Sequence, residues 1–540
     1  MTRILLRNGY VHTPADPHAT ALSIEDGQVV WTGDDDASAH FVDNADEVVD
    51  LAGRLVTPAF VDAHVHLAQT GLAAVSVDLS GTASLTEALD ALAAHARDRA
   101  AAAVILGFGW DESVWPEQRP FTREEVDRAT GNRAAFLSRI DVHSAVVSSA
   151  FLAACPDVVH AEGYDATGLI ARDAQHVARE GLFRMTSVAD REAAILRAFE
   201  AAARQGIGMV HELGAPHICP PEDFDIIGAL QESAIRRDRP ALPEAVWYWG
   251  SLVVDDARRL GCQGAAGDLC MDGSIGSHTS ALHAPYADAA TSGHLYLDAG
   301  QVTEHVVACT RAGLQAGFHV IGDRAVAEVV AGLRGAADRL GVAAVVQGRH
   351  RVEHAEMASP EEMRTFGELG VMASMQPLFD AYWGGPDSLY AQRLGTERAR
   401  PMNAFASMNR AGVALAFGSD SPVTPFAPWA AVRAAAWHHT ETERITVRAA
   451  FNAHTRGGWR AARRDEGGVI APGAPASIAV WDVAGDLAVQ TPDTRVAAWS
   501  TDPRAGVPQL PDLQPDAPLP TCVLTLVAGQ VAFEEPGALR

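Results

Sequence analysis

The sequence predicts an α/β protein built around a (β/α)8 barrel, with a β-sandwich built from both termini and an inserted subdomain after the first barrel strand. Three observations support this fold. Short β-like apolar runs alternate with Ala-rich amphipathic stretches from about residue 57 to residue 455. Similar β-like segments lie at both ends of the chain, and one gap between strand candidates far exceeds a single helical connection. We therefore expect sandwich strands in residues 1–56 and 456–540, and the barrel in residues 57–455.

The two ends of the chain carry the signals of short β-strands. Near the start, "RILLRNGYVHT" and "ALSIEDGQVVWTGDD" place Asn-Gly and Asp-Gly between alternating apolar residues, which indicates hairpins. Near the end, "ASIAVWDV" and "CVLTLVAGQVAFEE" have the same character. We expect both ends to pair into one β-sandwich, and the alternative is two unrelated β-appendages.

The central part contains eight strand candidates. In chain order they are "RLVTPAFVDAHVH", "GIGMVHELG", "EAVWYWGSL", "GDLCMDG", "QAGFHVIGD", "RHRVEHAE", "GVMASMQP" and "GVALAFGSD". Strands that alternate with helical stretches indicate a parallel sheet, and eight of them suggest a barrel. Because about 140 residues separate His66 from the next candidate near Gly206, we expect an inserted subdomain at about residues 75–190.

Charge and cysteine content exclude several classes of protein. A net charge of -26 without a visible basic patch disfavours binding to nucleic acid or anionic lipid. The sequence shows no apolar run long enough to span a bilayer and no signal peptide, so we expect a cytoplasmic protein. The six cysteines form no CxxC pair, which argues against a disulfide scaffold and a structural zinc cluster.

Polar side chains lie at the C-terminal ends of several strand candidates, the edge of a barrel that carries its chemistry. His64 and His66 flank one residue in "HVH", so both point to the same side of a strand. His319, His354 and Asp420 end three other candidates. Imidazole and carboxylate groups bind zinc, iron or manganese in hydrolases. The sequence thus predicts a divalent transition metal, zinc first, with iron or manganese as alternatives. For each residue alone, the alternative is a hydrogen-bonded core histidine or a capping aspartate.

Several longer motifs resemble those of the amidohydrolase superfamily, specifically amidohydrolase family 3, the YtcJ-like branch that includes N-substituted formamide deformylase. They are "LVTPAFVDAHVHL", "GFGWDESVWP", "MDGSIGSHTSALHAPYAD", "GFHVIGDRAV", "RVEHAEM", "FGSDSPVTP" and "GVIAPGAPASIAVWD". The resemblance implies a TIM-like barrel beside a β-sandwich and a metal that assists hydrolysis of an amide-like C–N bond.

The same resemblance assigns roles to individual residues. It makes His64, His66, His319 and His354 metal ligands, and it makes Asp420 a metal ligand that also handles the proton of the attacking water. Whichever of His319 and His354 does not bind metal would stabilise the oxyanion of the reaction.

One departure from the family concerns a second metal. Relatives with two metals often bridge them with a carboxylated lysine four residues before an Asp-Gly, a position held here by Asp268, and this chain contains no lysine. Either Asp268 bridges two metals directly, with Cys270 as a weaker thiolate candidate, or the site holds one metal. The short aspartate side chain favours one metal.

The substrate-binding residues are expected in the inserted subdomain and in the Gly/Ser-rich loop after the fourth strand candidate. The candidates are Trp110, Asp111, His143, His278 and Tyr286, with Trp115, Tyr382 and Trp383 as a further aromatic wall. The alternative is that the aromatic residues belong to the core. Glu353 precedes His354 directly and is expected to point into the other layer.

These observations favour an enzyme that hydrolyses a C–N bond in a small N-substituted amide or formamide by metal-activated water. The first alternative is a deaminase of a heterocyclic amine with the same metal site, and the second is a non-catalytic protein on a decayed hydrolase fold. We expect a small-molecule substrate as the partner, and no binding to nucleic acid or membrane. A homodimer is left as an open alternative.

Overall fold

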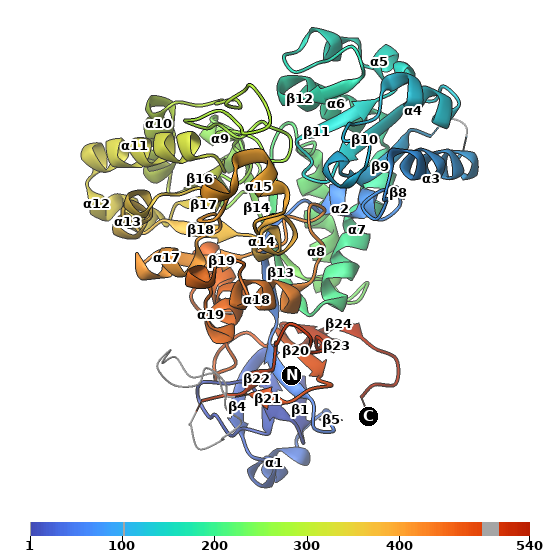
Figure 1. The fold of residues 1–540 in the computed structure, drawn as a ribbon. Helices are drawn as coiled ribbons and strands as arrows, with labels where there is room; N and C mark the ends of the chain where they lie inside the picture. The colour runs from blue at the N-terminus through green and yellow to red at the C-terminus, as the bar shows by residue number, and fades with distance from the viewer. Residues whose placement is uncertain (1, 101–102, 489–506, 540) are drawn as a thin grey trace.

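The barrel is a parallel sheet whose strands follow one another in chain order. A computed structural model describes residues 2–100, 103–488 and 507–539 of this protein. The eight strands in spatial order are β7 (Phe60–Val65), β13 (Ile207–Gly214), β14 (Glu244–Trp249), β15 (Gly264–Ala265), β16 (Gln315–Val320), β17 (Arg351–His354), β18 (Met372–Met375) and β19 (Ala414–Phe417). The predicted barrel is confirmed (Figure 1).

The sheet nearly closes where its first and last strands meet. The amide of His66 donates to the carbonyl of Ser421 at 2.9 Å, and the amide of Asp420 donates to the carbonyl of His64 at 2.8 Å. Gly418 permits this approach, since a Cβ there would lie 2.6 Å from the amide nitrogen of His64. Residues separated by more than three hundred positions are thereby neighbours.

The fourth strand differs from the expected segment "GDLCMDG". Its paired part is β15, three residues earlier, and Cys270 forms only an isolated bridge to His319. Between them Gly267 adopts a left-handed φ of +85°, and the main chain of Asp268 lies so close to Gly250 that a Cβ there would be 2.6 Å away. The chain therefore leaves the ladder at Asp268, at the C-terminal edge of the barrel.

Helices surround the barrel strands (Figure 1). They are α2 (Leu67–Ala73), α7 (Val188–Arg204), α8 (Glu222–Ile235), α9 (Val254–Arg259), α10 (Ala299–Ala312), α11 (Asp323–Leu340), α12 (Val342–Gly348), α13 (Pro360–Glu368), α14 (Pro377–Trp383), α15 (Leu389–Leu394), α16 (Thr396–Ala399), α17 (Phe405–Arg410), α18 (Pro428–Ala436), α19 (Val447–Asn452) and α20 (Gly458–Ala461). Local sequence sets their ends: α10 begins at a capping box between Asp298 and Gln301 and ends at the left-handed Gly313.

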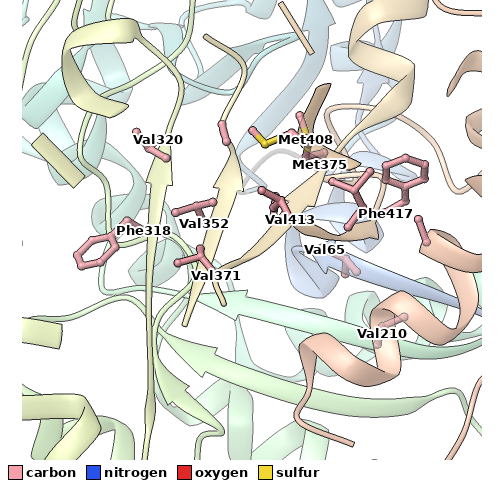
Figure 2. Close-up of a cluster of buried hydrophobic side chains, with 14 of the residues drawn as sticks. Val65, Val210, Phe318, Val320, Val352, Val371, Met375, Met408, Val413 and Phe417 are labelled. Carbon is pink, nitrogen blue, oxygen red and sulfur yellow. The ribbon is translucent and has the colours of Figure 1, made fainter. Parts of the chain in front are cut away.

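The core between strands and helices explains why the histidines face the barrel interior. Figure 2 shows Val65, Phe318, Val320 and Val352 among the buried apolar side chains of this core. Val65 lies between two of the site histidines, and Phe318 and Val320 flank a third. Because side chains alternate along a strand, burial of these apolar residues against the helices turns the histidines to the opposite face.

Both termini contribute to the β-structure below the barrel, as predicted (Figure 1). One sheet has the order β4 (Gln28–Gly33), β3 (Ala21–Glu25), β1 (Arg3–Arg7), β5 (Glu47–Asp50), with α1 (Asp35–Val42) beside it. The other has the order β2 (Tyr10–Val11), β6 (Leu55–Pro58), β20 (Ile478–Asp482), β23 (Thr521–Val527), β24 (Gln530–Glu534). A two-stranded sheet joins β21 (Leu487–Ala488) to β22 (Leu510–Pro511). Apolar residues from both larger sheets form one buried cluster.

A separate sheet follows the first barrel strand. Its order is β12 (Leu169–Ala171), β11 (Ser144–Val147), β10 (Ala135–Arg139), β9 (Ile105–Trp110), β8 (Val77–Asp78), with helices α3 (Leu85–Asp98), α4 (Arg123–Thr130), α5 (Ser149–Ala154) and α6 (Arg172–Met185). We call this unit the subdomain. Among the helices in the described ranges, none combines the length and the apolar composition that crossing a membrane requires.

Candidate metal centre

Six buried side chains converge at the C-terminal edge of the barrel. They are His64, His66, Asp268, His319, His354 and Asp420. They form three overlapping groups whose ligand atoms lie within 4.8 Å of one another. The groups are His64, His354 and Asp420; His64, His66 and Asp268; and Asp268, His319 and His354. The structure thus brings together every residue that the sequence proposed as a metal ligand, apart from Cys270.

Short distances between rings and carboxylates define the centre. The Nε2 atom of His64 lies 3.3 Å from Asp420 Oδ1 and 3.5 Å from Asp268 Oδ1. The Nε2 atom of His66 lies 3.2 Å from Asp420 Oδ1 and 3.3 Å from Asp268 Oδ2. Asp268 Oδ1 also lies 3.9 Å from His319 Nδ1. The carboxylate of Asp268 therefore reaches both the first-strand histidines and the fifth-strand histidine.

Hydrogen bonds behind the rings fix their orientation. His64 Nδ1 donates to Glu353 Oε2 at 3.1 Å, and His354 Nδ1 donates to Gln376 Oε1 at 2.7 Å. These bonds hold the proton on Nδ1 and leave Nε2 of each ring free to bind a metal. The ring of His319 has the opposite orientation, since its Nε2 lies 3.4 Å from the carbonyl of Gly273.

The position of Glu353 corrects the expectation from strand alternation. Glu353 points into the barrel, where it pairs with Arg351 at 2.5 Å and accepts from His64. His354, the next residue, should then face outward, but its left-handed φ of +68° turns its ring back inside. Two successive residues of β17 therefore serve the same centre.

The donor atoms of the centre fit a metal ion. Within the described ranges, His64 Nε2, His354 Nε2, Asp268 Oδ1 and Asp420 Oδ1 are buried and have no hydrogen-bond partner. Buried polar atoms nearly always have partners, so four that converge at one place fit a site for a cation. Four imidazoles and two carboxylates form a donor set that suits zinc, iron or manganese.

The carboxylates and the rings shift one another's pKa values. Burial opposes protonation of His66, but Asp268 and Asp420 outweigh it and raise the pKa of His66 to about 9. The same carboxylates raise the pKa of His64 against the effect of burial. Burial lowers the pKa of His354 to about 3, and the positive charges of His319 and His64 add to this effect. Without a cation, the first-strand rings therefore take up protons.

This proton uptake predicts a pH-dependent metal affinity. At pH 7, zinc binding to metal-free protein is expected to release about one proton from each of His64 and His66, because a ring must be neutral to bind a metal. Isothermal titration calorimetry in buffers of different ionisation enthalpy measures this release. The apparent affinity should rise with pH up to about 9, the pKa of His66. Binding at pH 7 without proton release would contradict this prediction.

The stability of the metal-free protein has the opposite pH dependence. Because the pKa of His66 is raised from 6.5 to about 9, the stability it contributes is fully present below pH 6.5 and is lost as the pH rises through 9. Thermal unfolding of the metal-free protein at pH values between 6.5 and about 9 provides the control for the calorimetry.

A narrow cavity lies over the centre and opens toward a wider cleft. The cavity holds about 20 Å³ and is lined by His319, His354 and Asp420, and on its far side by Phe379, Trp383 and Tyr390. The outer cleft holds about 840 Å³ and lies between the subdomain and helices α14 and α15. Trp383 lines both spaces. A substrate would enter through the cleft, and only a small part of it would fit over the centre.

The structure places the proposed substrate residues in different surroundings. His143 lines the cavity, and its ring centroid lies 4.9 Å from that of His319. Asp111 lines the outer cleft, where it pairs with Arg139 at 2.9 Å. Trp110 belongs to the apolar core of the subdomain with Trp115, and its indole N–H donates to the carbonyl of Leu137. Trp110 and Trp115 therefore stabilise the subdomain.

The loop after the fourth strand is held by its own contacts. His278 Nε2 lies 2.9 Å from Asp288 Oδ1, and the Tyr286 hydroxyl donates to the carbonyl of Ser280 at 3.2 Å. Neither side chain lines the cavity over the metal centre or the outer cleft. Tyr382 and Trp383 do line the cleft.

No role was predicted for several polar residues that lie near the centre. On α6, Gln175, His176 and Arg179 share one helix face by their spacing of three and four residues. The ring of His176 stacks on that of His217 at 4.1 Å, and His217 Nε2 lies 3.7 Å from Cys270 Sγ. The periodicity of polar residues in "DAQHVAREGL" indicates this helix face, but the same periodicity fits a face exposed to solvent.

Comparison with known proteins gives matches over nearly the whole chain. A model described as the amidohydrolase family matches residues 47–533. Protein LONG AFTER FAR-RED 3 of Arabidopsis thaliana is 27% identical, and the match covers 89% of this chain and 88% of that protein. The putative amidohydrolase YtcJ of Bacillus subtilis is 23% identical, with 84% and 89% covered. The N-substituted formamide deformylase of Arthrobacter pascens is 32% identical over 136 residues, which is 25% of each chain.

A solved structure shares most of this architecture. The crystal structure of an uncharacterized metal-dependent hydrolase from Pyrococcus horikoshii is 26% identical to this chain, with a TM-score of 0.71. The match covers 89% of this chain and 97% of that one. The relative therefore shares the fold over most of this chain.

Proposed function

This chain belongs to the amidohydrolase family of metal-dependent hydrolases, and from that premise we propose that it hydrolyses the C–N bond of a small N-substituted amide or formamide. The observation that carries this proposal is the convergence of four histidines and two aspartates whose buried donor atoms lack partners. The partial match to an N-substituted formamide deformylase supports the substrate class. The size of the cavity supports it as well, since about 20 Å³ holds little more than a water-sized group.

The six converging residues would hold the metal. Asp268 belongs to one group with His64 and His66 and to another with His319 and His354, which favours two cations over one. We choose zinc, because histidine and carboxylate ligands suit it, and iron or manganese would accept the same ligands. Such a cation lowers the pKa of a water molecule toward 7 and polarises a substrate carbonyl.

The remaining chemistry falls to the side chains of this chain. Asp420 lines the cavity with an unpartnered Oδ1, so its carboxylate can accept the proton of the attacking water and return it to the leaving nitrogen. Burial lowers the pKa of His143 to about 3, so its ring is neutral at pH 7 and can donate a hydrogen bond to the substrate carbonyl oxygen. Phe379, Trp383 and Tyr390 would exclude water around the substituent.

A metal analysis and a substrate screen test this function together. Protein purified without chelators and reconstituted with zinc is expected to contain about two equivalents of metal and to hydrolyse N-substituted formamides faster than longer N-acyl amides. Plasma mass spectrometry and release of formate measure the two quantities. Absence of bound metal after reconstitution with zinc, iron and manganese would overturn the proposal. Release of ammonia from heterocyclic amines, with no cleavage of amides, would favour deamination instead.

A further inference from the structure

Arg179 is an exception among the buried arginines of this protein. The described ranges contain five buried arginines: Arg139, Arg179, Arg191, Arg351 and Arg393. All but Arg179 pair with carboxylates within 3.0 Å. Arg179 forms no ion pair in those ranges and donates to the carbonyl of Val142. A buried charge without a counter-charge is costly, so this position calls for an explanation.

The guanidinium of Arg179 lies close to the metal centre, since it donates to the carbonyl of Val142, and the next residue, His143, lines the cavity over the centre. Its charge lowers the pKa of the His143, His176 and His217 rings, with burial as the larger cause for each. Burial lowers the pKa of Arg179 itself to about 10, and Asp268 is the first of the negative groups that oppose this effect. Asp268 and Asp420, which belong to the metal centre, stabilise its charge together with Asp141. Cations bound at the centre would neutralise the first two and weaken this compensation.

Space for a ligand group adjoins Arg179. The residue lines a cavity of about 60 Å³ between α2 and the subdomain. Phe108 and Pro422 line both this cavity and the outer cleft, so the two spaces adjoin. Phe108, Leu182 and Phe183 make most of the rest of its wall apolar. An anion placed there would have one strong partner.

We propose that Arg179 binds a carboxylate of the substrate, so that the preferred substrates are amides bearing a carboxylate near the nitrogen. This inference rests on the proposed function and names its substrate class. The planar fork of a guanidinium matches a carboxylate with two parallel hydrogen bonds, a pairing that the compact lysine ammonium does not reproduce. The bound carboxylate supplies the counter-charge that the described residues do not provide.

A pair of matched substrates tests the role of Arg179. N-formylalanine and N-formylalaninamide have nearly the same shape and differ in charge. The wild-type protein is expected to prefer N-formylalanine, and Arg179→Met should lower kcat/KM for it by roughly 10- to 100-fold while changing the amide less than about threefold. The loss should appear mainly in KM. Arg179→Lys should recover part of it.

Gln175→Met provides the matched control. Gln175 donates to the same Val142 carbonyl at 2.6 Å, so this substitution removes a structural hydrogen bond and no charge. If Arg179 only holds Val142, Gln175→Met and Arg179→Met should affect both substrates alike, and the proposal is overturned. Should Arg179→Met fail to fold by circular dichroism, Arg179→Gln takes its place, since it keeps a donor for the carbonyl.

Binding without turnover separates this inference from the proposed function. 4-Oxopentanoate has a ketone and a carboxylate but no hydrolysable bond, and 5-hydroxypentan-2-one is its uncharged counterpart. Calorimetry on zinc-loaded protein is expected to show tighter binding of 4-oxopentanoate, and Arg179→Met should remove the difference. Equal binding of both compounds by the wild-type protein would overturn the role of Arg179. If the carboxylate binds tighter but no formamide is cleaved, the proposed function and the substrate class fail, and only the role of Arg179 in binding a carboxylate stands.

Discussion

Replacement of Asp420 by asparagine is expected to lower kcat by roughly 10²- to 10⁴-fold, the range that a general acid–base group contributes. Asparagine keeps the shape of the side chain and one oxygen that can bind a metal, but it cannot accept the proton of the attacking water. The Oδ1 atom of Asp420 lies 3.2 Å from His66 Nε2 and 3.3 Å from His64 Nε2, so the carboxylate is also a candidate ligand. Formate release and metal content must therefore be measured on the same preparation.

A substitution in the same loop controls for this experiment. Ser421 follows Asp420 directly and accepts a hydrogen bond from the Thr70 hydroxyl at 3.0 Å, but it has no group that transfers protons at neutral pH. Ser421→Ala is expected to retain most of the activity. The role assigned to Asp420 would be untenable if Asp420→Asn retained full metal and a kcat within about tenfold of the wild-type value.

Replacement of Asp268 by asparagine is expected to reduce the metal content from about two equivalents to about one or fewer, with a loss of activity of at least about 100-fold. The reason is that both oxygens of Asp268 face ligand rings: Oδ2 lies 3.3 Å from His66 Nε2, and Oδ1 lies 3.5 Å from His64 Nε2. An amide nitrogen in place of one oxygen cannot bind a cation. Plasma mass spectrometry after zinc reconstitution gives the stoichiometry.

Cys270→Ser is the matched control for Asp268. Cys270 lies two residues away on the same segment, its thiol contacts His217 at 3.7 Å, and burial raises its pKa, so no reactive thiolate is expected. Cys270→Ser should leave the metal content unchanged. An unchanged metal content in Asp268→Asn would favour a single metal. A loss of metal in Cys270→Ser would identify the thiol as a ligand.

For the residues of this centre that lie on regular strands, the sequence alone predicted that they come together. His64, His66 and His319 follow the alternation of strands whose other residues, such as Val65 and Val320, belong to the core. Parallel strands bring their C-terminal ends to one edge, so histidines at those ends had to converge. Topology alone therefore predicted where these side chains meet.

Irregular backbone accounts for what the sequence left open. The prediction of one metal rested on the short side chain of an aspartate. The left-handed Gly267 takes the chain out of the ladder at Asp268, whose carboxylate lies within 3.9 Å of the His64, His66 and His319 rings. Likewise, alternation placed Glu353 in the wrong layer, because it could not reveal the left-handed φ of His354. Non-glycine residues adopt this conformation rarely, and only the surrounding tertiary structure determines where.

Residues of the subdomain could be predicted only in part, for a different reason. The position of α6 relative to the barrel depends on packing between two units of the chain, which no local pattern encodes. Trp110 and Arg179 show both consequences: an aromatic residue near the expected pocket lies in the core of the subdomain, and a residue without any expectation lies beside the metal centre. Helical periodicity identifies a face but not the partner of that face.

The closing seam of the barrel has a consequence for how activity relates to folding. The main-chain bonds that join the first strand to the last are made by His64, His66, Asp420 and Ser421, three of which also supply side chains to the centre. A cation bound there would link the two ends of the barrel chain, and it would stabilise only the state in which they have met. A partly assembled barrel would have neither the seam nor the centre.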